Sequence, residues 1–181
     1  MIKIRIDDSQ IMDFAKKSPQ RARWATAESL KMGGGHTRKK MREWIEKGGE
    51  NWPPLSHPTK KLAEAQHRSE RTPLFGLGRF VRFKYSNRGG NQQVRIGFMN
   101  TVVTRIAKTV QYGKRIRVTP SLREHFARRK IFLRKSTTYL NVPPRPIIEP
   151  FWRREERETL NYIEKKFFEK FFSKQKPNLR Y

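Results

Sequence analysis

The side chains that usually carry out catalysis are scarce in this 181-residue sequence and do not fall at catalytic spacings. No two histidines lie four residues apart and no His-Glu-x-x-His arrangement occurs, so the spacing that places two zinc ligands on one helix face is missing. The four histidines are His36, His57, His67 and His125. Cysteine is absent, which excludes disulfide bonds, thiolate metal ligands and a cysteine nucleophile. The sequence therefore predicts no metal site, no cofactor and no enzymatic activity.

The acidic residues and the glycine pairs also predict structural roles. Glu155, Glu156 and Glu158 alternate with arginines at helical spacing, which is typical of a solvated helix face whose charges pair with one another. Gly113-Lys114-Arg115 lacks the upstream glycine and the following hydroxyl of a phosphate-binding loop. Gly76-Leu77-Gly78 lacks the third glycine of a dinucleotide-binding turn. Both segments are better explained as turns.

Positive charge is the chemistry that this sequence has in excess. It contains 42 Lys and Arg against 16 Asp and Glu, a formal charge of +26, and most of the excess lies within residues 61–150. Such a field attracts polyanions and opposes self-association. Eight cations lie within twenty-one residues, with Phe126 and Phe132 among them: Arg115, Arg117, Arg123, Arg128, Arg129, Lys130, Arg134 and Lys135.

Two interpretations of this basic segment stay open. Long cationic side chains can contact the phosphates of DNA without reading bases, or they can coat a small domain and pair with acidic neighbouring subunits. No zinc finger, RNP signature or clear helix-turn-helix accompanies the charge, so sequence-specific recognition has little support. In both interpretations the candidate contacts with DNA or an acidic partner are Arg115, Arg117, Arg128, Arg129, Lys130, Arg134 and Lys135.

The elements that must position these residues begin with a β-hairpin. Residues 79–85 and 94–98 alternate apolar with mostly polar or basic side chains, and the polar segment 87–91 lies between them. Residues 2–6 alternate isoleucine with Lys and Arg, which predicts a short edge or opening strand.

Helices are predicted before the hairpin. Asp7-Asp8-Ser9 can cap a first helix, and Ser18-Pro19 can begin a second helix over residues 19–32. Gly33-Gly34-Gly35 is expected to break or loosen that helix before it resumes through residues 41–45. We favour a loop between two helices at these glycines over a hinge between subunit contacts.

After the hairpin, the pattern predicts two helices, a short strand at 116–118, an extended segment over 131–146 and a final helix over 147–172. Asn100-Thr101 can cap a helix that ends at Gly113, with Val103, Ile106, Ala107 and Val110 on its buried face. Pro120 to Glu124 resembles a capping box that opens a helix through Lys130. The final helix is expected to bury Trp152, Leu160, Ile163, Phe167 and Phe171.

Together these elements predict an α+β fold, a small antiparallel sheet with a central hairpin flanked by N-terminal and C-terminal helices. The length favours one domain over residues 1–181, with a helical region at 1–50, a basic sheet and extended-arm region at 79–146, and a C-terminal helix at 147–172. The amino terminus lacks the apolar core of a signal peptide, and no apolar run is long enough to cross a bilayer. We therefore expect a soluble protein made in the cytoplasm, with no membrane contact.

Apolar residues outside the expected core predict a subunit interface. Phe167-Phe168 and Phe171-Phe172 provide more aromatic surface than one helix stripe needs, so we expect Phe168 and Phe172 to pack against an adjacent subunit rather than a membrane. Trp52 and Leu55 anchor a proline-rich loop and are further candidates for this interface.

The order of several short motifs resembles that of the tailed-bacteriophage virion morphogenesis family, the tail-completion and head–tail joining proteins. The resemblance covers about residues 40–170 and rests on the order and spacing of the motifs. They are Trp52-Pro53-Pro54-Leu55-Ser56 with Thr59-Lys60-Lys61, the hairpin ending in Val94-Arg95-Ile96-Gly97-Phe98, then Gln111-Tyr112-Gly113, and Val142-Pro143-Pro144-Arg145-Pro146 before a last helix. The family usually has Pro-Ala-Arg-Pro at the last motif, and the segment Arg115 to Lys135 is longer and more basic here than the resemblance leads one to expect.

The resemblance implies a structural α+β subunit at the head–tail junction of a virion, a tail-completion, tail-terminator or connector protein without catalytic activity. It implies a homo-oligomeric ring, with a hexamer favoured, that contacts other neck, tail-tube or connector proteins and is assembled in the host cytoplasm. Genomic DNA in the lumen of the ring is a further expected partner of the basic segment. The alternative is a non-specific nucleic-acid-binding protein, which would bind DNA in a salt-dependent way without forming a ring.

Overall fold

The computed structural model describes residues 2–4, 19–54, 60 and 74–173 and has an α+β fold, as predicted. Two compact units are distinguished, each built from segments that are distant in the sequence. The first comprises residues 1–42, 81–98 and 151–181, and the second comprises residues 43–80 and 99–150. The expected basic region at 79–146 is thus divided, since its hairpin belongs to the first unit. The expectation of a single domain stays a prediction.

The first unit contains a three-stranded antiparallel sheet in the order β1-β3-β2, built from β1 (Ile2–Ile4), β2 (Val81–Arg88) and β3 (Asn91–Phe98). The predicted hairpin is confirmed, and β1 forms the predicted edge strand over residues 2–4. Gly89 and Gly90 make the two-residue turn, with φ values of 58° and 84°. Positive φ at both positions defines a type I′ turn, whose twist matches that of the two strands.

Helix α2 (Pro19–Glu46) runs through the three glycines without a break, so the predicted loop at residues 33–35 is wrong. Its start at Pro19 is as predicted. The glycines serve close packing instead of flexibility. A Cβ atom added at Gly33 would lie 2.8 Å from Cδ1 of Ile163, and one added at Gly34 would lie 2.8 Å from atoms of both Phe83 and Val94. A Cβ at Gly35 would meet no atom within 4 Å.

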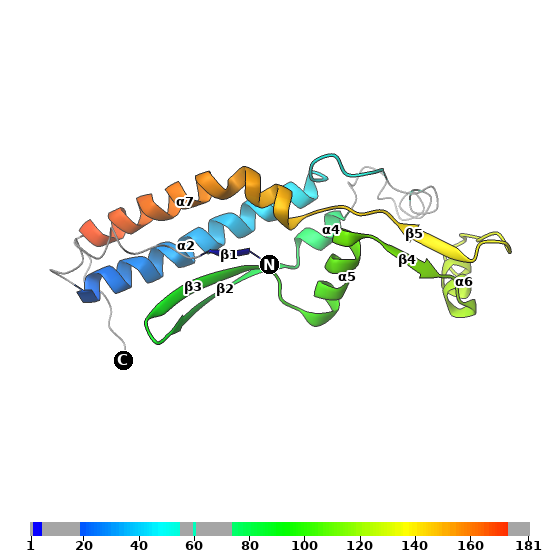
Figure 1. Ribbon diagram of the computed structural model, residues 1–181, viewed down its shortest axis with the longest axis horizontal. Helices are drawn as coiled ribbons and strands as arrows, with labels where there is room; N and C mark the ends of the chain where they lie inside the picture. Colours follow the sequence, from blue (N-terminus) through cyan, green and yellow to red (C-terminus); the bar gives the residue numbers. More distant parts are fainter. Residues whose placement is uncertain (1, 5–18, 55–59, 61–73, 174–181) are drawn as a thin grey trace. The chain divides into compact units, whose positions relative to one another are not determined.

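Helix α7 (Ile148–Phe172) lies along α2 in the first unit (Figure 1). Its buried residues recur every fourth position from Thr159 to Phe171, and they face small residues of α2. Phe167 and Phe171 form a core cluster with Ala22 and Ala25. Leu160 was expected in this face but is exposed, because the buried stripe follows Thr159 and Ile163. Trp152 is only partly buried, since Phe151 occupies the core position beside it.

Adjacent glycines on α2 thus face two different layers. Gly33 faces α7 and Gly34 faces the sheet, through Phe83 on β2 and Val94 on β3. Since successive residues of a helix point about 100° apart, two neighbouring small residues permit close approach on two sides. Helix α2 is therefore packed between α7 and the sheet.

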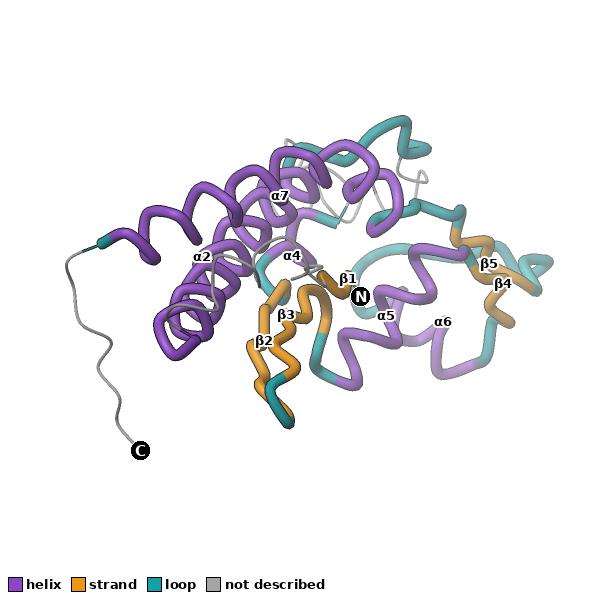
Figure 2. The backbone as a smooth tube through the Cα atoms, turned by 60° about the vertical axis from the view of Figure 1, so that its left-hand side comes forward, coloured by secondary structure: helices purple, strands orange, loops and turns teal. Residues whose placement is uncertain are grey.

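The second unit contains α4 (Phe75–Gly78), α5 (Thr101–Tyr112), β4 (Lys114–Arg117), α6 (Pro120–Ala127) and β5 (Tyr139–Val142). Strands β4 and β5 form a separate two-stranded antiparallel sheet, and α6 lies close to it (Figures 1 and 2). The predicted cap of α5 is confirmed, since Oδ1 of Asn100 accepts hydrogen bonds from the amides of Val102 and Val103 at 3.0 and 3.2 Å.

Three expectations in the second unit are wrong in detail. Ile106 is 50% exposed, because the buried face of α5 follows Val103, Ala107 and Val110. Helix α6 is capped by Thr119, whose Oγ1 accepts from the amide of Leu122, so Pro120 occupies the first turn and no capping box forms. The helix also ends at Ala127, before Lys130. Within the segment 131–146, expected to be extended, Tyr139–Val142 is a strand and the other residues form no regular secondary structure. The first predicted helix of the chain, capped by Asp7-Asp8-Ser9, lies outside the residues that the structure describes.

Candidate interaction surfaces

A set of contacts that we call the proline clasp joins two motifs about ninety residues apart in the second unit. The guanidinium of Arg145 donates hydrogen bonds to the carbonyl oxygen of Pro53 at 3.2 and 3.0 Å and to that of Pro54 at 3.1 Å. In return, Nε1 of Trp52 donates to the carbonyl oxygen of Pro146 at 2.9 Å. The clasp therefore fixes Trp52-Pro53-Pro54 against Arg145-Pro146.

The same clasp reaches the end of helix α5. The amide of Arg145 donates to the carbonyl oxygen of Val110 at 2.8 Å, which satisfies one of the free carbonyls at the end of that helix. Gly113 follows with φ 71°, and a Cβ there would lie 2.9 Å from the carbonyl oxygen of Val142 and 3.0 Å from the nitrogen of Pro144. Glycine is therefore required where α5 passes this segment.

Arg145 is a buried cation, with an exposed fraction of only 5%. Its burial lowers the pKa of the guanidinium, yet arginine remains charged at any physiological pH. Its described side-chain partners are carbonyl oxygens rather than a carboxylate. Because a buried charge is tolerated only when it is hydrogen-bonded, the proline carbonyls and Arg145 depend on each other.

Trp52 packs within the second unit, contrary to what a purely intersubunit role would require. Its indole ring meets that of Trp44 edge to face at a centroid distance of 5.3 Å, and it fills the space beside Gly49. It remains partly exposed, so the predicted subunit contact stays a prediction. Leu55, the other candidate in this loop, lies outside the described residues.

A second surface, which we call the basic lobe, comprises residues 114–142. It contains nine Lys or Arg and one carboxylate, Glu124. All seven cations predicted as DNA or acidic-partner contacts are exposed, and they come from three parts of the lobe. Arg115 and Arg117 lie on β4, Arg128 to Lys130 follow α6, and Arg134 and Lys135 lie in the segment before β5.

The β4–β5 ribbon presents one face to solvent. Arg115 pairs across the ladder with Asn141, and Arg117 pairs with Tyr139, so these four exposed side chains share a face. The guanidinium carbon of Arg115 lies 4.0 Å from the centroid of the Tyr139 ring, a cation–π contact that holds this arginine over the ribbon. The opposite face carries the partly buried Ile116, Leu140 and Val142.

Arg123 organises the segment that precedes β5. Its guanidinium donates to four backbone carbonyls, those of Thr137 at 2.6 Å, Arg134 and Lys135 at 3.0 Å, and Leu133 at 3.3 Å. A single side chain thus holds a segment with no regular secondary structure over residues 131–138. Arg123 therefore positions Arg134 and Lys135 although it was not among the predicted contacts.

Lys130 occupies a backbone conformation that normally favours glycine. After α6, the amide of Lys130 donates to the carbonyl of Ala127 and that of Ile131 to the carbonyl of Phe126, at 2.8 and 3.0 Å. These bonds form a Schellman motif, which places Lys130 at the left-handed position with φ 58° and buries Ile131. The exposed cation is therefore present where glycine would be easier to accommodate.

Replacing Lys130 with glycine is expected to raise the free energy of unfolding by about 1 kcal/mol, because a side chain in the left-handed region costs about that much. Urea-induced unfolding measures the change. Lys135→Gly, at an exposed position without a positive φ, is the control and should not stabilise the protein. If Lys130→Gly were no more stable than the natural protein, the left-handed backbone conformation of Lys130 would not be strained.

A third surface lies on α7 in the first unit and consists of Phe168 and Phe172, which we call the aromatic ridge. These side chains are 43% and 61% exposed, and their rings stack at a centroid distance of 6.2 Å. Phe167 and Phe171, beside them in the sequence, are buried against α2. The ridge is therefore apolar surface left over after the helix has packed, which is consistent with its prediction as an interface.

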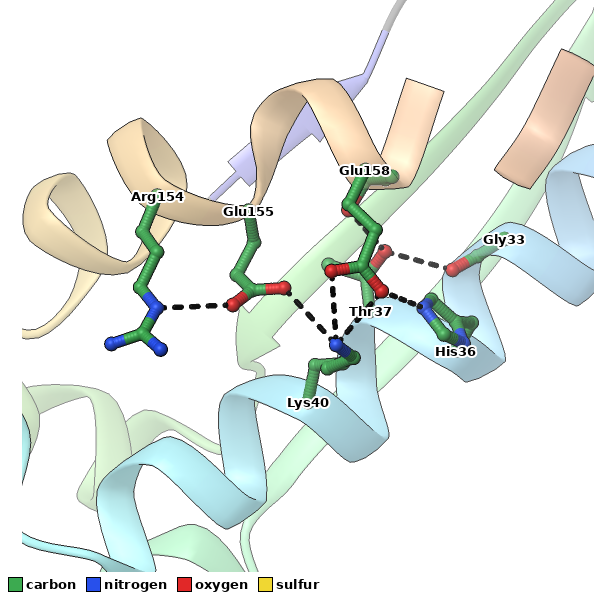
Figure 3. A network of polar contacts seen from close by, with 8 residues as sticks. Gly33, His36, Thr37, Lys40, Arg154, Glu155 and Glu158 are labelled. Atoms are coloured by element: carbon green, nitrogen blue, oxygen red, sulfur yellow. Dashed lines mark hydrogen bonds and ion pairs between the residues drawn. The ribbon is translucent and has the colours of Figure 1, made fainter. Parts of the chain in front are cut away.

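The acidic cluster of α7 pairs with helix α2, and the expectation that it pairs only with its own helix is wrong. Nζ of Lys40 lies 2.8 Å from a carboxylate oxygen of Glu158 and 3.5 Å from one of Glu155, as seen in Figure 3. Arg154 makes the expected local contact with Glu155 at 3.5 Å. Below this network, the hydroxyls of Thr37 and Thr159 meet at 3.4 Å between the helices.

Removal of the Lys40 charge is expected to raise the pKa of Glu158. The hydrogen bond from Lys40 is the main reason that this pKa lies below its ordinary value. The favourable contribution is present above the ordinary glutamate pKa and is lost as the pH falls through the lowered value. In Lys40→Met, carbon-13 NMR should show Glu158 titrating closer to its ordinary pH, whereas Glu169, whose pKa Lys166 lowers, should not change. Unchanged titration of Glu158 would contradict the contact.

Other potential sites were sought in the same residues. No three His, Asp or Glu side chains gather as a metal-binding group within the described ranges. In the part of the chain that the structure describes, no helix is both long and apolar enough to traverse a bilayer. The sequence matches no protein-family model, and neither a search of curated proteins nor one of solved structures finds a match.

Proposed function

We propose that this protein is a structural virion subunit at the head–tail junction of a tailed bacteriophage, a tail-completion, tail-terminator or connector protein that assembles as a ring. The proposal starts from the resemblance in motif order. The proline clasp is the observation that supports it best. Two of the motif segments, Trp52-Pro53-Pro54 and Gln111-Tyr112-Gly113, contact a third, Val142 to Pro146, in the second unit.

This contact gives the motif order a physical basis. Short motifs such as Trp-Pro-Pro recur by chance, but here the carbonyls of one motif are satisfied by the arginine of another. Gly113 allows the end of α5 to lie close to Val142 and Pro144, in the segment that carries this arginine. A sequence that kept Arg145 without Trp52-Pro53-Pro54 would leave a buried cation without these hydrogen-bond acceptors, so the motifs are expected to occur together.

The aromatic ridge supports assembly from several copies. Exposed apolar surface on a small protein usually marks an interface, and a ring requires each subunit to present surface that only its neighbours cover. Glu164, Lys165 and Glu169 surround the ridge on α7 and can fix the register of a neighbouring subunit by charge. On this account Phe168 and Phe172 contact the adjacent subunit or a neighbouring neck or tail protein.

Light scattering coupled to size-exclusion chromatography tests assembly of the purified protein. We expect a ring, with a hexamer favoured, and expect Phe168→Ser combined with Phe172→Ser to dissociate it without loss of helical circular dichroism. Phe132→Ser is the matched control, since Phe132 is an 82% exposed aromatic side chain of the basic lobe. A natural protein that stays monomeric at all concentrations, or a ring that survives loss of the ridge, would contradict the assembly role of α7.

A further inference from the structure

We propose that the β4–β5 ribbon of the basic lobe binds the backbone of double-stranded DNA without sequence specificity. The inference goes beyond the proposed function and does not depend on it, because DNA binding is measured on the purified protein and joining is measured on particles. The ligand class follows from the shape of the ribbon, from its charge and from the way in which its neighbouring segments are held.

The shape of the ribbon suits a DNA groove. A two-stranded antiparallel ribbon is one of the two elements that the major groove of B-form DNA admits. The exposed face of β4–β5 carries Arg115 and Arg117, with Asn141 and Tyr139 opposite them on β5. Arginine, asparagine and tyrosine side chains all donate hydrogen bonds to phosphate oxygens, the contacts that position a protein on DNA.

The charge of the basic lobe is largely uncompensated within the described residues. Its single carboxylate, on Glu124, pairs with Arg128 at 2.6 Å. Arg117, Lys130, Arg134 and Lys135 make no ion pair with any part of the chain that the structure describes. Cations that are not neutralised by the protein release condensed counterions when they meet DNA phosphates, which is the main source of affinity in non-specific binding.

The lobe is also held in place before any ligand binds. Arg123 fixes the backbone that carries Arg134 and Lys135 through four hydrogen bonds, and the Tyr139 ring holds Arg115. Lys130 is kept in the left-handed conformation by the Schellman motif. Binding therefore does not have to order these segments, which lowers the entropic cost of association.

The composition of the exposed surface favours DNA over an acidic protein. Protein interfaces are built around an apolar core that is depleted in charged residues other than arginine. Lys and Arg are the most frequent exposed residues of the basic lobe, and Phe132 and Tyr139 are its exposed large apolar residues within the described ranges. Surfaces that bind DNA are far more positively charged and need no such apolar core.

Fluorescence anisotropy with a random-sequence DNA duplex tests the inference on the full-length protein. Arg115→Gln combined with Arg117→Gln should weaken binding by about tenfold or more near 0.1 M salt, and should reduce the slope of log affinity against log salt by about two. The matched control is Lys84→Gln combined with Arg95→Gln. Lys84 and Arg95 are exposed cations on β2 and β3, where they pair across the antiparallel sheet of the first unit. Their substitution removes the same charge as the substitution of Arg115 and Arg117.

We expect the control pair to keep affinity within about twofold of the natural protein, because it leaves the phosphate contacts of the ribbon intact. General electrostatic attraction alone would instead be weakened about equally by the two variants, since they remove the same charge. Equal weakening by both pairs would overturn the inference and assign binding to the overall charge. Competition by poly-glutamate as effective as that by DNA, charge for charge, would assign the lobe to an acidic protein instead. Absence of binding at low salt would also overturn it. None of these outcomes tests ring assembly or head–tail joining, which are measured by light scattering and by electron microscopy of particles.

Discussion

Substitution of Arg145 by alanine is expected to lower the free energy of unfolding by about 3 kcal/mol. The variant loses three hydrogen bonds from a charged donor to the carbonyls of Pro53 and Pro54, and hydrogen bonds that involve a charged group contribute about 1.5–3 kcal/mol. Urea-induced unfolding of the two proteins measures the difference.

Lysine at position 145 separates charge from geometry. Arg145→Lys keeps the positive charge, but it cannot present the fork that reaches two carbonyls at once, so it should recover less than half of the loss. Arg134→Ala, at an exposed arginine of the same unit, is the control and should change stability by less than about 0.5 kcal/mol. If Arg145→Ala were as mild as this control, the clasp would not hold the second unit together.

Substitution of Gly33 by alanine is expected to lower the free energy of unfolding by about 1–2 kcal/mol, whereas the same change at Gly35 should raise it by about 0.5–1 kcal/mol. Alanine is the better helix former at both positions by about 1 kcal/mol. At Gly33 the new methyl group meets the fully buried Ile163, and overpacking a filled core costs about 1–3 kcal/mol. At Gly35 no atom lies within 4 Å of the added carbon.

A second substitution distinguishes packing from other effects. Ile163→Ala removes both Cγ1 and Cδ1, the two atoms nearest to an added Cβ at Gly33, so Gly33→Ala combined with Ile163→Ala should be less destabilised than the sum of the single variants. Thermal or urea-induced unfolding of the four proteins gives the coupling. Stabilisation by Gly33→Ala equal to that of Gly35→Ala would show that α2 and α7 do not approach closely at this point.

The elements set by local sequence were predictable. Alternation identified β2 and β3, the Gly89-Gly90 pair supplied the positive φ values of their turn, and the Asn100 side chain capped α5 as expected. In each case the residues that determine the structure lie within a few positions of one another. Such signals are readable from one sequence because they require no knowledge of distant partners.

The errors arise where distant residues decide the outcome. Gly33 and Gly34 resemble a helix breaker in isolation, and only the presence of Ile163, Phe83 and Val94 shows that their lack of a side chain permits packing. Ile106 was assigned to the wrong face of α5 because helical spacing alone did not exclude it from the buried stripe. Tertiary contacts override local propensity in both cases.

The candidate surfaces also combine features that the sequence predicted with features that depend on distant residues. The exposure of Arg115, Arg128 and the other predicted cations could be anticipated, because Lys and Arg side chains are rarely buried. Arg123 and Arg145 lie in the same kind of sequence but serve as internal donors, and nothing in their spacing distinguishes them. For Arg145, the surrounding prolines were a usable signal, since their carbonyls need donors from elsewhere.

Electron microscopy of lysates from a phage in which the gene for this chain carries an early stop codon tests the proposed function most directly. Free heads, free tails and joined particles are counted with and without the protein supplied from a plasmid. The account predicts unjoined heads and tails, with aberrant tail ends or lengths, and restoration of joined particles by the natural protein but not by Phe168→Ser combined with Phe172→Ser. Normal, infectious particles in the absence of the protein would contradict it.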